Sequence, residues 1–124
     1  MPGAIWLWID LIGSTAVTDE LVYQSTATLA RRIRLREVSS REVLDALLER
    51  VSKLDGPINS VVTIDAERAG REAAAADEAI GRDAPRGALH GVPMTVKDSW
   101  QTAGMRTTSG ATKVRRVLGY LLSR

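Results

Sequence analysis

The chain has 124 residues, of which 44% are hydrophobic and 26% are charged, as is usual for one small globular domain. It contains no cysteine, which excludes disulfides, thiol catalysis and cysteine-ligated metals, and its single histidine, His90, excludes a histidine-rich metal centre. Four of the 17 basic residues lie in residues 113–124, so the rest of the chain has 13 basic and 15 acidic residues. We therefore expect no nucleic-acid-binding surface on the main body of the protein.

Residues 1–20 are expected to form an N-terminal extension. The run MPGAIWLWIDLIG is apolar, but a membrane span takes about 20 apolar residues, and Asp10 interrupts this one. The positively charged start and the small-residue cleavage site of a secretory signal are not evident either. We therefore expect no membrane partner. A chain without cysteine fits the reducing cytoplasm, which is the expected location.

The region of residues 25–54 predicts two helices. In the first, apolar residues four apart share a face, while the arginines point mostly elsewhere. In the second, Ser39 and Glu42 have the spacing of a capping box. Apolar residues then follow at steps of three and four along one helical stripe: Leu44, Leu47, Leu48, Val51 and Leu54. The sequence Asp-Gly-Pro at residues 55–57 is expected to end this helix.

Two later segments predict β-strands, residues 58–65 (INSVVTID), rich in β-branched side chains, and residues 92–98 (VPMTVKD). Between them, Asp65 can cap an alanine-rich helix that ends at Gly81. A polar, glycine-bearing loop follows the second strand. The order helix, helix, strand, helix, strand and loop predicts the start of an α/β domain. Because a parallel sheet is normally buried on both faces, two strands are too few, and we expect the domain to be incomplete.

Lys97 lies at the end of the second predicted strand, beside Asp98, and the residues alone leave two interpretations open. The lysine can be structural, with its stem packed on the core and its ammonium reaching water or Asp98. Alternatively it can be a desolvated amine, because burial favours the neutral form, which accepts a proton and can activate a serine hydroxyl.

Residues 87–111, GALHGVPMTVKDSWQTAGMRTTSGA, resemble the segment around the catalytic lysine of the amidase signature family. The family pattern Gly-x-Leu-x-Gly-(Val/Ile)-Pro-x-x-x-Lys-Asp, followed by Gly and Thr-Thr, is matched by Gly87, Leu89, Gly91, Val92, Pro93, Lys97, Asp98, Gly104, Thr107 and Thr108. The helical and strand segments upstream are also similar to those that open this family. The resemblance implies that residues 21–112 are the N-terminal part of an α/β/α mixed-sheet amidase fold, incomplete in this chain.

The resemblance also implies a chemistry, the hydrolysis of small-molecule amides by a Ser–cisSer–Lys triad without metal or cofactor. Lys97 would be the catalytic lysine and Asp98 its supporting acid. The two serines lie downstream in the family, the nucleophile in a stretch of the kind Gly-Gly-Ser-x-Gly, which is not found here. Ser99 and Ser109 are interpreted as loop residues, because nothing local supplies an oxyanion hole, and His90 as a packed or hydrogen-bonded residue.

Residues 113–124, KVRRVLGYLLSR, depart from the family pattern and are expected to be an atypical basic tail, as after a frameshift or in a truncated reading frame. The first functional hypothesis is an amidase fragment that is inactive alone. The alternative is an interaction module or split-amidase subunit that complements a separately encoded C-terminal half. We also expect marginal folding in isolation, because two strands with open edges favour aggregation.

Overall fold

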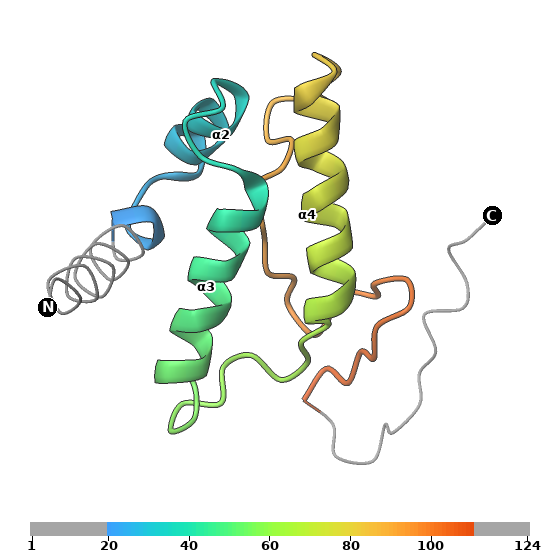
Figure 1. The fold of residues 1–124 in the computed structure, drawn as a ribbon. Helices are drawn as coiled ribbons and strands as arrows, with labels where there is room; N and C mark the ends of the chain where they lie inside the picture. The colour runs from blue at the N-terminus through green and yellow to red at the C-terminus, as the bar shows by residue number, and fades with distance from the viewer. Residues whose placement is uncertain (1–19, 111–124) are drawn as a thin grey trace, which may run out of the picture.

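The computed structural model describes residues 20–110, so the predictions for residues 1–19 and 113–124 lie outside the described residues. The helices that begin and end within this part are α2 (Thr26–Arg34), α3 (Ser40–Leu54) and α4 (Ala66–Gly81). Figure 1 shows α3 and α4 side by side, with α2 near their upper ends. All three helices were predicted. None of the described helices has the length and hydrophobicity that a membrane span requires.

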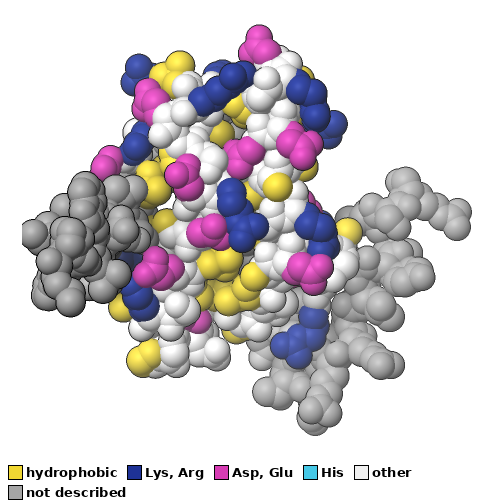
Figure 2. Space-filling model, in the orientation of Figure 1, with side chains coloured by type: hydrophobic (Ala, Val, Ile, Leu, Met, Phe, Trp, Pro, Cys, Tyr) yellow, Lys and Arg dark blue, Asp and Glu magenta, His cyan; other side chains and the backbone are white. Residues whose placement is uncertain are grey.

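Charged side chains of both signs are scattered over the visible surfaces of α3 and α4, as Figure 2 shows. Many form ion pairs one helical turn apart within a helix: Arg41–Asp45, Lys53–Glu49, Arg68–Glu72, Arg71–Glu67 and Arg82–Glu78. Exposed pairs of this kind contribute only a few tenths of a kcal/mol each, about 0.3–0.5. The helices are therefore held together mainly by their apolar contacts and by the end contacts described below.

The buried core lies where the three helices meet, and it is built from short aliphatic side chains: Leu21, Leu29, Ile33, Val38, Val43, Ala46 and Ile80. Of the stripe predicted on α3, only Leu44 is buried, and Leu54 is half exposed. Val43 and Ala46 of α3 take core positions that the stripe did not include. The buried face of α3 is thus shifted from the predicted stripe, because its core residues cluster with Leu29 and Ile33 of α2 and with Ile80 of α4.

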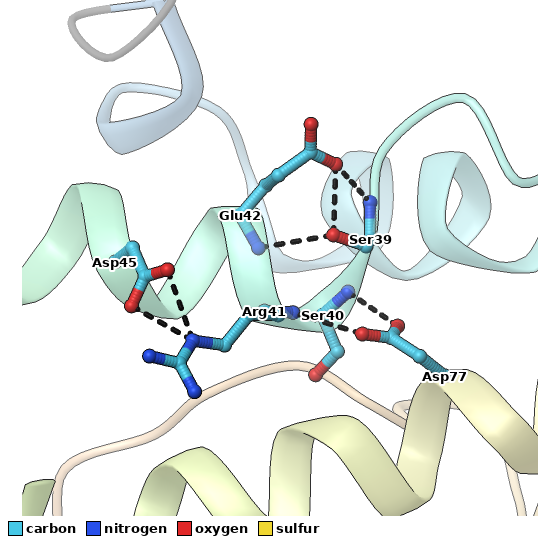
Figure 3. A network of polar contacts seen from close by, with 6 residues as sticks. All are labelled: Ser39, Ser40, Arg41, Glu42, Asp45 and Asp77. Atoms are coloured by element: carbon cyan, nitrogen blue, oxygen red, sulfur yellow. Dashed lines mark hydrogen bonds and ion pairs between the residues drawn. The ribbon is translucent and has the colours of Figure 1, made fainter.

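Both capping predictions at the starts of α3 and α4 are confirmed. Ser39 Oγ accepts from Glu42 N at 3.0 Å, and Glu42 Oε2 accepts from Ser39 N at 2.8 Å, so the capping box is complete (Figure 3). Asp65 Oδ1 accepts from Arg68 N at 3.0 Å at the start of α4. Each contact satisfies a backbone donor that the helix itself leaves free, which fixes where the helix begins.

A second cap on α3 comes from the neighbouring helix. Asp77 of α4 accepts from Ser40 N at 2.7 Å and from Arg41 N at 3.1 Å, one bond on each carboxylate oxygen (Figure 3). The negative charge also lies at the positive end of the α3 dipole. This carboxylate therefore joins α3 to α4 at one register, and no local pattern in the sequence predicted it.

Replacing Asp77 by alanine is expected to lower the free energy of unfolding by about 1–2 kcal/mol, because two amides at the start of α3 lose their acceptor. Chemical denaturation followed by circular dichroism measures this change. Glu78→Ala is the matched control, since Glu78 is exposed and its ion pair within residues 20–110 is the one with Arg82 at 3.5 Å. This variant should cost no more than about 0.5 kcal/mol. Equal losses for the two variants would contradict the role of Asp77.

The predicted strands at residues 58–65 and 92–98 are not formed, so the α/β class is not observed in residues 20–110, which are helical with irregular connections. Residues 59–65 and 92–97 have no regular secondary structure, and turns occupy residues 56–58 and 98–99. The physical reason is that a strand is stable only when its backbone pairs with neighbouring strands, and the two segments do not pair with each other.

Candidate functional site

The segment that leads to Lys97 starts on the helices. Ser40, buried at the start of α3, donates its hydroxyl proton to Gly91 O. Gly91 has φ +80°, a backbone conformation that glycine adopts without strain, and a Cβ at this position would lie 3.2 Å from Ile33 Cγ2. Both the backbone conformation and the available space therefore require glycine here, six residues before the lysine.

His90, the residue before Gly91, attaches the chain to α4. Its Nδ1 accepts from Arg86 N at 3.1 Å, so the ring hydrogen lies on Nε2, which donates to Ala76 O of α4 at 3.1 Å. The expectation that His90 is a hydrogen-bonded structural residue is confirmed. Together, His90 and Gly91 anchor the start of the lysine segment to α3 and α4.

Lys97 itself is exposed. Its backbone oxygen accepts from Trp100 N at 2.9 Å, which begins the turn that follows. Within residues 20–110, the ion pairs join other basic side chains to carboxylates and do not include Lys97. The described residues therefore do not surround its amine with the apolar side chains that the second interpretation required, whereas an exposed amine agrees with the first interpretation, in which the ammonium reaches water.

Asp98 binds the loop that follows, not the lysine. Its Oδ1 accepts from Thr108 N at 2.9 Å, its Oδ2 accepts from the Thr108 hydroxyl, and its backbone oxygen accepts from Ser109 N at 3.1 Å. These hydrogen bonds, first that of the Thr108 hydroxyl and then that of the Thr108 amide, hold the pKa of the Asp98 carboxyl below its usual value. The carboxylate thus joins two residues ten positions apart and closes a loop directly after Lys97.

The closed loop is also attached to α4. Arg68 Nη1 donates to Ala103 O at 2.6 Å, and the buried Thr107 donates its hydroxyl proton to Trp100 O at 3.2 Å. Ser99 and Ser109 are both exposed, and neither has a hydrogen bond to Lys97 within the described residues. Sequence reasoning missed Thr108 as the partner of Asp98, although the Thr-Thr pair of the family pattern was the available signal.

No other catalytic or metal-binding arrangement is found in the part of the chain that the structure describes. Its acidic and histidine side chains form no group of three or more that could hold a metal ion. A shallow hollow lies beside α2, between Arg31, Arg34 and residues 88–89, and it does not include Lys97. The anchored segment with Lys97 and Asp98 is therefore the candidate site.

Three carboxylates with lowered pKa values predict that the protein loses stability in acid. Hydrogen bonds from the amide and hydroxyl of Ser39 lower the pKa of Glu42. Hydrogen bonds from the hydroxyl and amide of Ser60 lower the pKa of Asp55. The pKa of Asp98 is lowered by Thr108, as described above. A folded-state pKa below the unfolded value gives stability that is present above the unfolded pKa, about 4, and is lost as the pH falls through the folded value.

We therefore expect the thermal midpoint to be constant above about pH 5 and to fall progressively below about pH 4. Calorimetry or circular dichroism between pH 7 and pH 2 measures it. Ser60→Ala should lower the midpoint at neutral pH and flatten the acid decline, because the pKa of Asp55 returns toward its ordinary value. A midpoint that rises as the pH falls from 5 to 3 would contradict this prediction.

Comparison with known proteins decides the family. The Amidase family model matches residues 42–117, a segment that includes Lys97 and Asp98. The chain belongs to the amidase family. The resemblance expected from the lysine segment is thus confirmed, whereas the roles of Lys97 and Asp98 remain predictions.

The curated relatives of this amidase-family chain include proteins named as the A subunit of glutamyl-tRNA(Gln) amidotransferase. That of Nocardia farcinica is 41% identical over 91 residues, which are 73% of this chain and 19% of the relative. That of Moorella thermoacetica is 39% identical over 89 residues, 72% of this chain and 18% of the relative. The chain spans about a fifth of the length of these relatives. No solved structure matches it.

Proposed function

We propose that this chain is the part of an amidase that supplies the proton-relay lysine, Lys97, and that it hydrolyses amide bonds only together with polypeptide that supplies two serines. The family match over residues 42–117 is the observation that supports this most directly. The proposed substrate class is a small-molecule amide. The chain alone, without a serine motif of the kind Gly-Gly-Ser-x-Gly, is proposed to be inactive.

The geometry around Lys97 supports a site in which the lysine backbone is held in place but the lysine side chain is not yet covered by other protein. The lysine lies between two fixed points, Gly91 on the helices and the loop that Asp98 closes, so its backbone is constrained on both sides. Its side chain is exposed and available to another layer of protein. Covering that side chain would remove water, favour the neutral amine and so make it a proton acceptor.

The proposed reaction follows from these roles. Neutral Lys97 takes the hydroxyl proton of a bridging serine, and the bridging serine takes the proton of the nucleophilic serine as the nucleophilic oxygen attacks the amide carbonyl carbon. Backbone amides stabilise the resulting oxyanion, and collapse of the tetrahedral intermediate breaks the carbon–nitrogen bond as the leaving amine takes the proton that Lys97 returns through the bridging serine. Water then hydrolyses the acyl-enzyme. In this scheme Asp98 acts through the loop that it holds with Thr108 and does not pair with the amine.

A chimera tests this function. Residues 20–110 replace the matching segment of the Nocardia farcinica relative, and the purified chimera and the 124-residue chain are assayed with a panel of primary amides and anilides. Turnover is expected for the chimera and not for the chain. A folded chimera without turnover would contradict the proposal. Turnover by the chain alone that Lys97→Ala abolishes would contradict the proposed inactivity.

The second candidate is a split-amidase subunit, and the apolar side chains exposed on residues 58–64 and 94–96 favour it. In this form the serines come from a separately encoded polypeptide that binds the chain. Reading the downstream DNA in three frames discriminates between the two forms. An immediate continuation with a Gly-Gly-Ser-x-Gly stretch indicates one interrupted protein, whereas an independent start codon before it indicates a complementing pair.

A further inference from the structure

The loop that follows Lys97 is attached to the helices by one hydrogen bond. Within residues 20–110, the other hydrogen bonds of this loop join residues 97–110 to one another. The exception runs from Arg68 Nη1 of α4 to Ala103 O, at 2.6 Å. Figure 1 shows the loop beside the lower end of α4, which is the start of that helix. Arg68 therefore connects a loop that is closed on itself to the helical part of the protein.

The side chain of Arg68 is itself fixed. It lies in the first turn of α4, and its Nε donates to Glu72 Oε1 at 2.8 Å, which leaves Nη1 for the loop. Gly104 has φ +76°, and a Cβ at this position would lie 3.4 Å from Arg68 Nη1, so the guanidinium also approaches the loop backbone closely. The side chain is 37% exposed, whereas that of Arg71 on the same helix is 65% exposed. The contact with the loop thus partly covers Arg68.

Lys97 lies between this attachment and the one at Gly91. Gly91 O, which accepts from Ser40, is six residues upstream, and residues 92–96 in between have no regular secondary structure. Lys97 O accepts from Trp100 N, so the lysine is the first residue of the turn that begins the loop. The orientation of the loop therefore determines where the amine lies. A displacement of roughly 1 Å from the productive geometry can lower a catalytic rate about 100-fold.

We propose that Arg68 is a positioning residue for Lys97, because its guanidinium fixes the loop of residues 98–108 against the start of α4 and so holds the amine in place for proton transfer. This inference rests on the proposed function of Lys97. Arg68 acts through the loop and not on the reacting atoms. Its Nη1 and Nε are bonded to Ala103 O and Glu72, and within the described residues no hydrogen bond joins it to the lysine.

Hydrogen exchange in the 124-residue chain tests the attachment without any activity measurement. In Arg68→Ala the amides of Met105 and Thr108 are expected to exchange at least about fivefold faster, because the loop opens more often once it is released from α4. Arg71→Ala is the matched control, since Arg71 is an exposed arginine on the same helix, and it should leave these amides unchanged. Equal exchange in the two variants would overturn the proposal. An equal acceleration in the middle of α3 would indicate a general loss of stability and would also overturn it.

Kinetics of the chimera test the effect on the site. Arg68→Ala is expected to lower kcat for a primary amide at least about 10-fold and to leave KM within about twofold, because the variant displaces the proton acceptor and removes no contact with the substrate. Arg71→Ala should leave both kcat and KM within about twofold. A kcat for Arg68→Ala within twofold of that for Arg71→Ala would overturn the proposal.

A double-mutant cycle in the chimera shows whether Arg68 acts through Lys97. In the Lys97→Ala chimera, the further change Arg68→Ala is expected to lower kcat by less than about twofold, because no amine is left to position. An equal loss in both backgrounds would indicate a structural role and would overturn the proposal. Faster exchange of the loop amides in Arg68→Ala, together with a chimera that has no turnover, would support the attachment by Arg68 while contradicting the proposed function.

Discussion

Lys97→Ala in the chimera is expected to lower kcat for amide hydrolysis by at least about 10³-fold, because removing one member of a catalytic triad has effects of this size or larger. KM should change little, since the amine acts on proton transfer between the serines and does not bind the acyl group. Lys97→Arg should also be inactive, because the guanidinium stays protonated and cannot accept a proton. Steady-state kinetics with a single primary amide measures kcat and KM of Lys97→Ala and the activity of Lys97→Arg.

Lys53→Ala is the control for this experiment. Lys53 is an exposed lysine on α3, paired with Glu49 one turn away, and its loss should leave kcat within about twofold. Activity in Lys97→Arg would show that the residue supplies only positive charge. An equal loss in Lys97→Ala and Lys53→Ala would show that the effect is not specific to the candidate site.

Ile33→Ala is expected to lower the free energy of unfolding by about 3 kcal/mol, within the range found for large aliphatic side chains replaced by alanine in protein cores. Ile33 is 1% exposed, belongs to the core cluster and lies against the backbone of Gly91. The cavity would therefore open between α2 and the start of the lysine segment. Urea denaturation followed by circular dichroism measures the loss, together with any decrease of helix content in buffer.

Leu35→Ala is the matched control, since Leu35 lies two residues further along and is 53% exposed. Its replacement should change the free energy of unfolding by less than about 0.5 kcal/mol. A loss for Ile33→Ala below about 1 kcal/mol would mean that the core can collapse around the cavity, which would contradict a rigid contact between Ile33 and Gly91.

The helices could be predicted from sequence because their signals are local. The box of Ser39 and Glu42 marks the start of α3, and Asp65 marks that of α4, each within three residues of its partner. The strands were predicted wrongly as elements of this structure, although the β-branched pattern is present in both segments. A strand depends on partners distant in sequence, and a local pattern cannot state whether those partners are present.

The sequence pattern located the candidate site, but it did not predict the long-range contacts that hold the site in place. Lys97 and Asp98 were selected from the run that ends the second apolar segment, and the family match includes both. The contacts of Ser40 with Gly91 and with Asp77 could not be predicted, because they join residues 51 and 37 positions apart through the packing of α3 on α4.

The sequence separation of these contacts also determines the order in which parts of the protein can fold during translation. Asp77 leaves the ribosome long after Ser40, so the first turn of α3 must rely on its own capping box until most of α4 has emerged. Gly91 arrives later still. The helices can therefore associate vectorially, and the stretch that presents the amine gains a fixed position only after them, when Gly91 and then Thr108 have emerged.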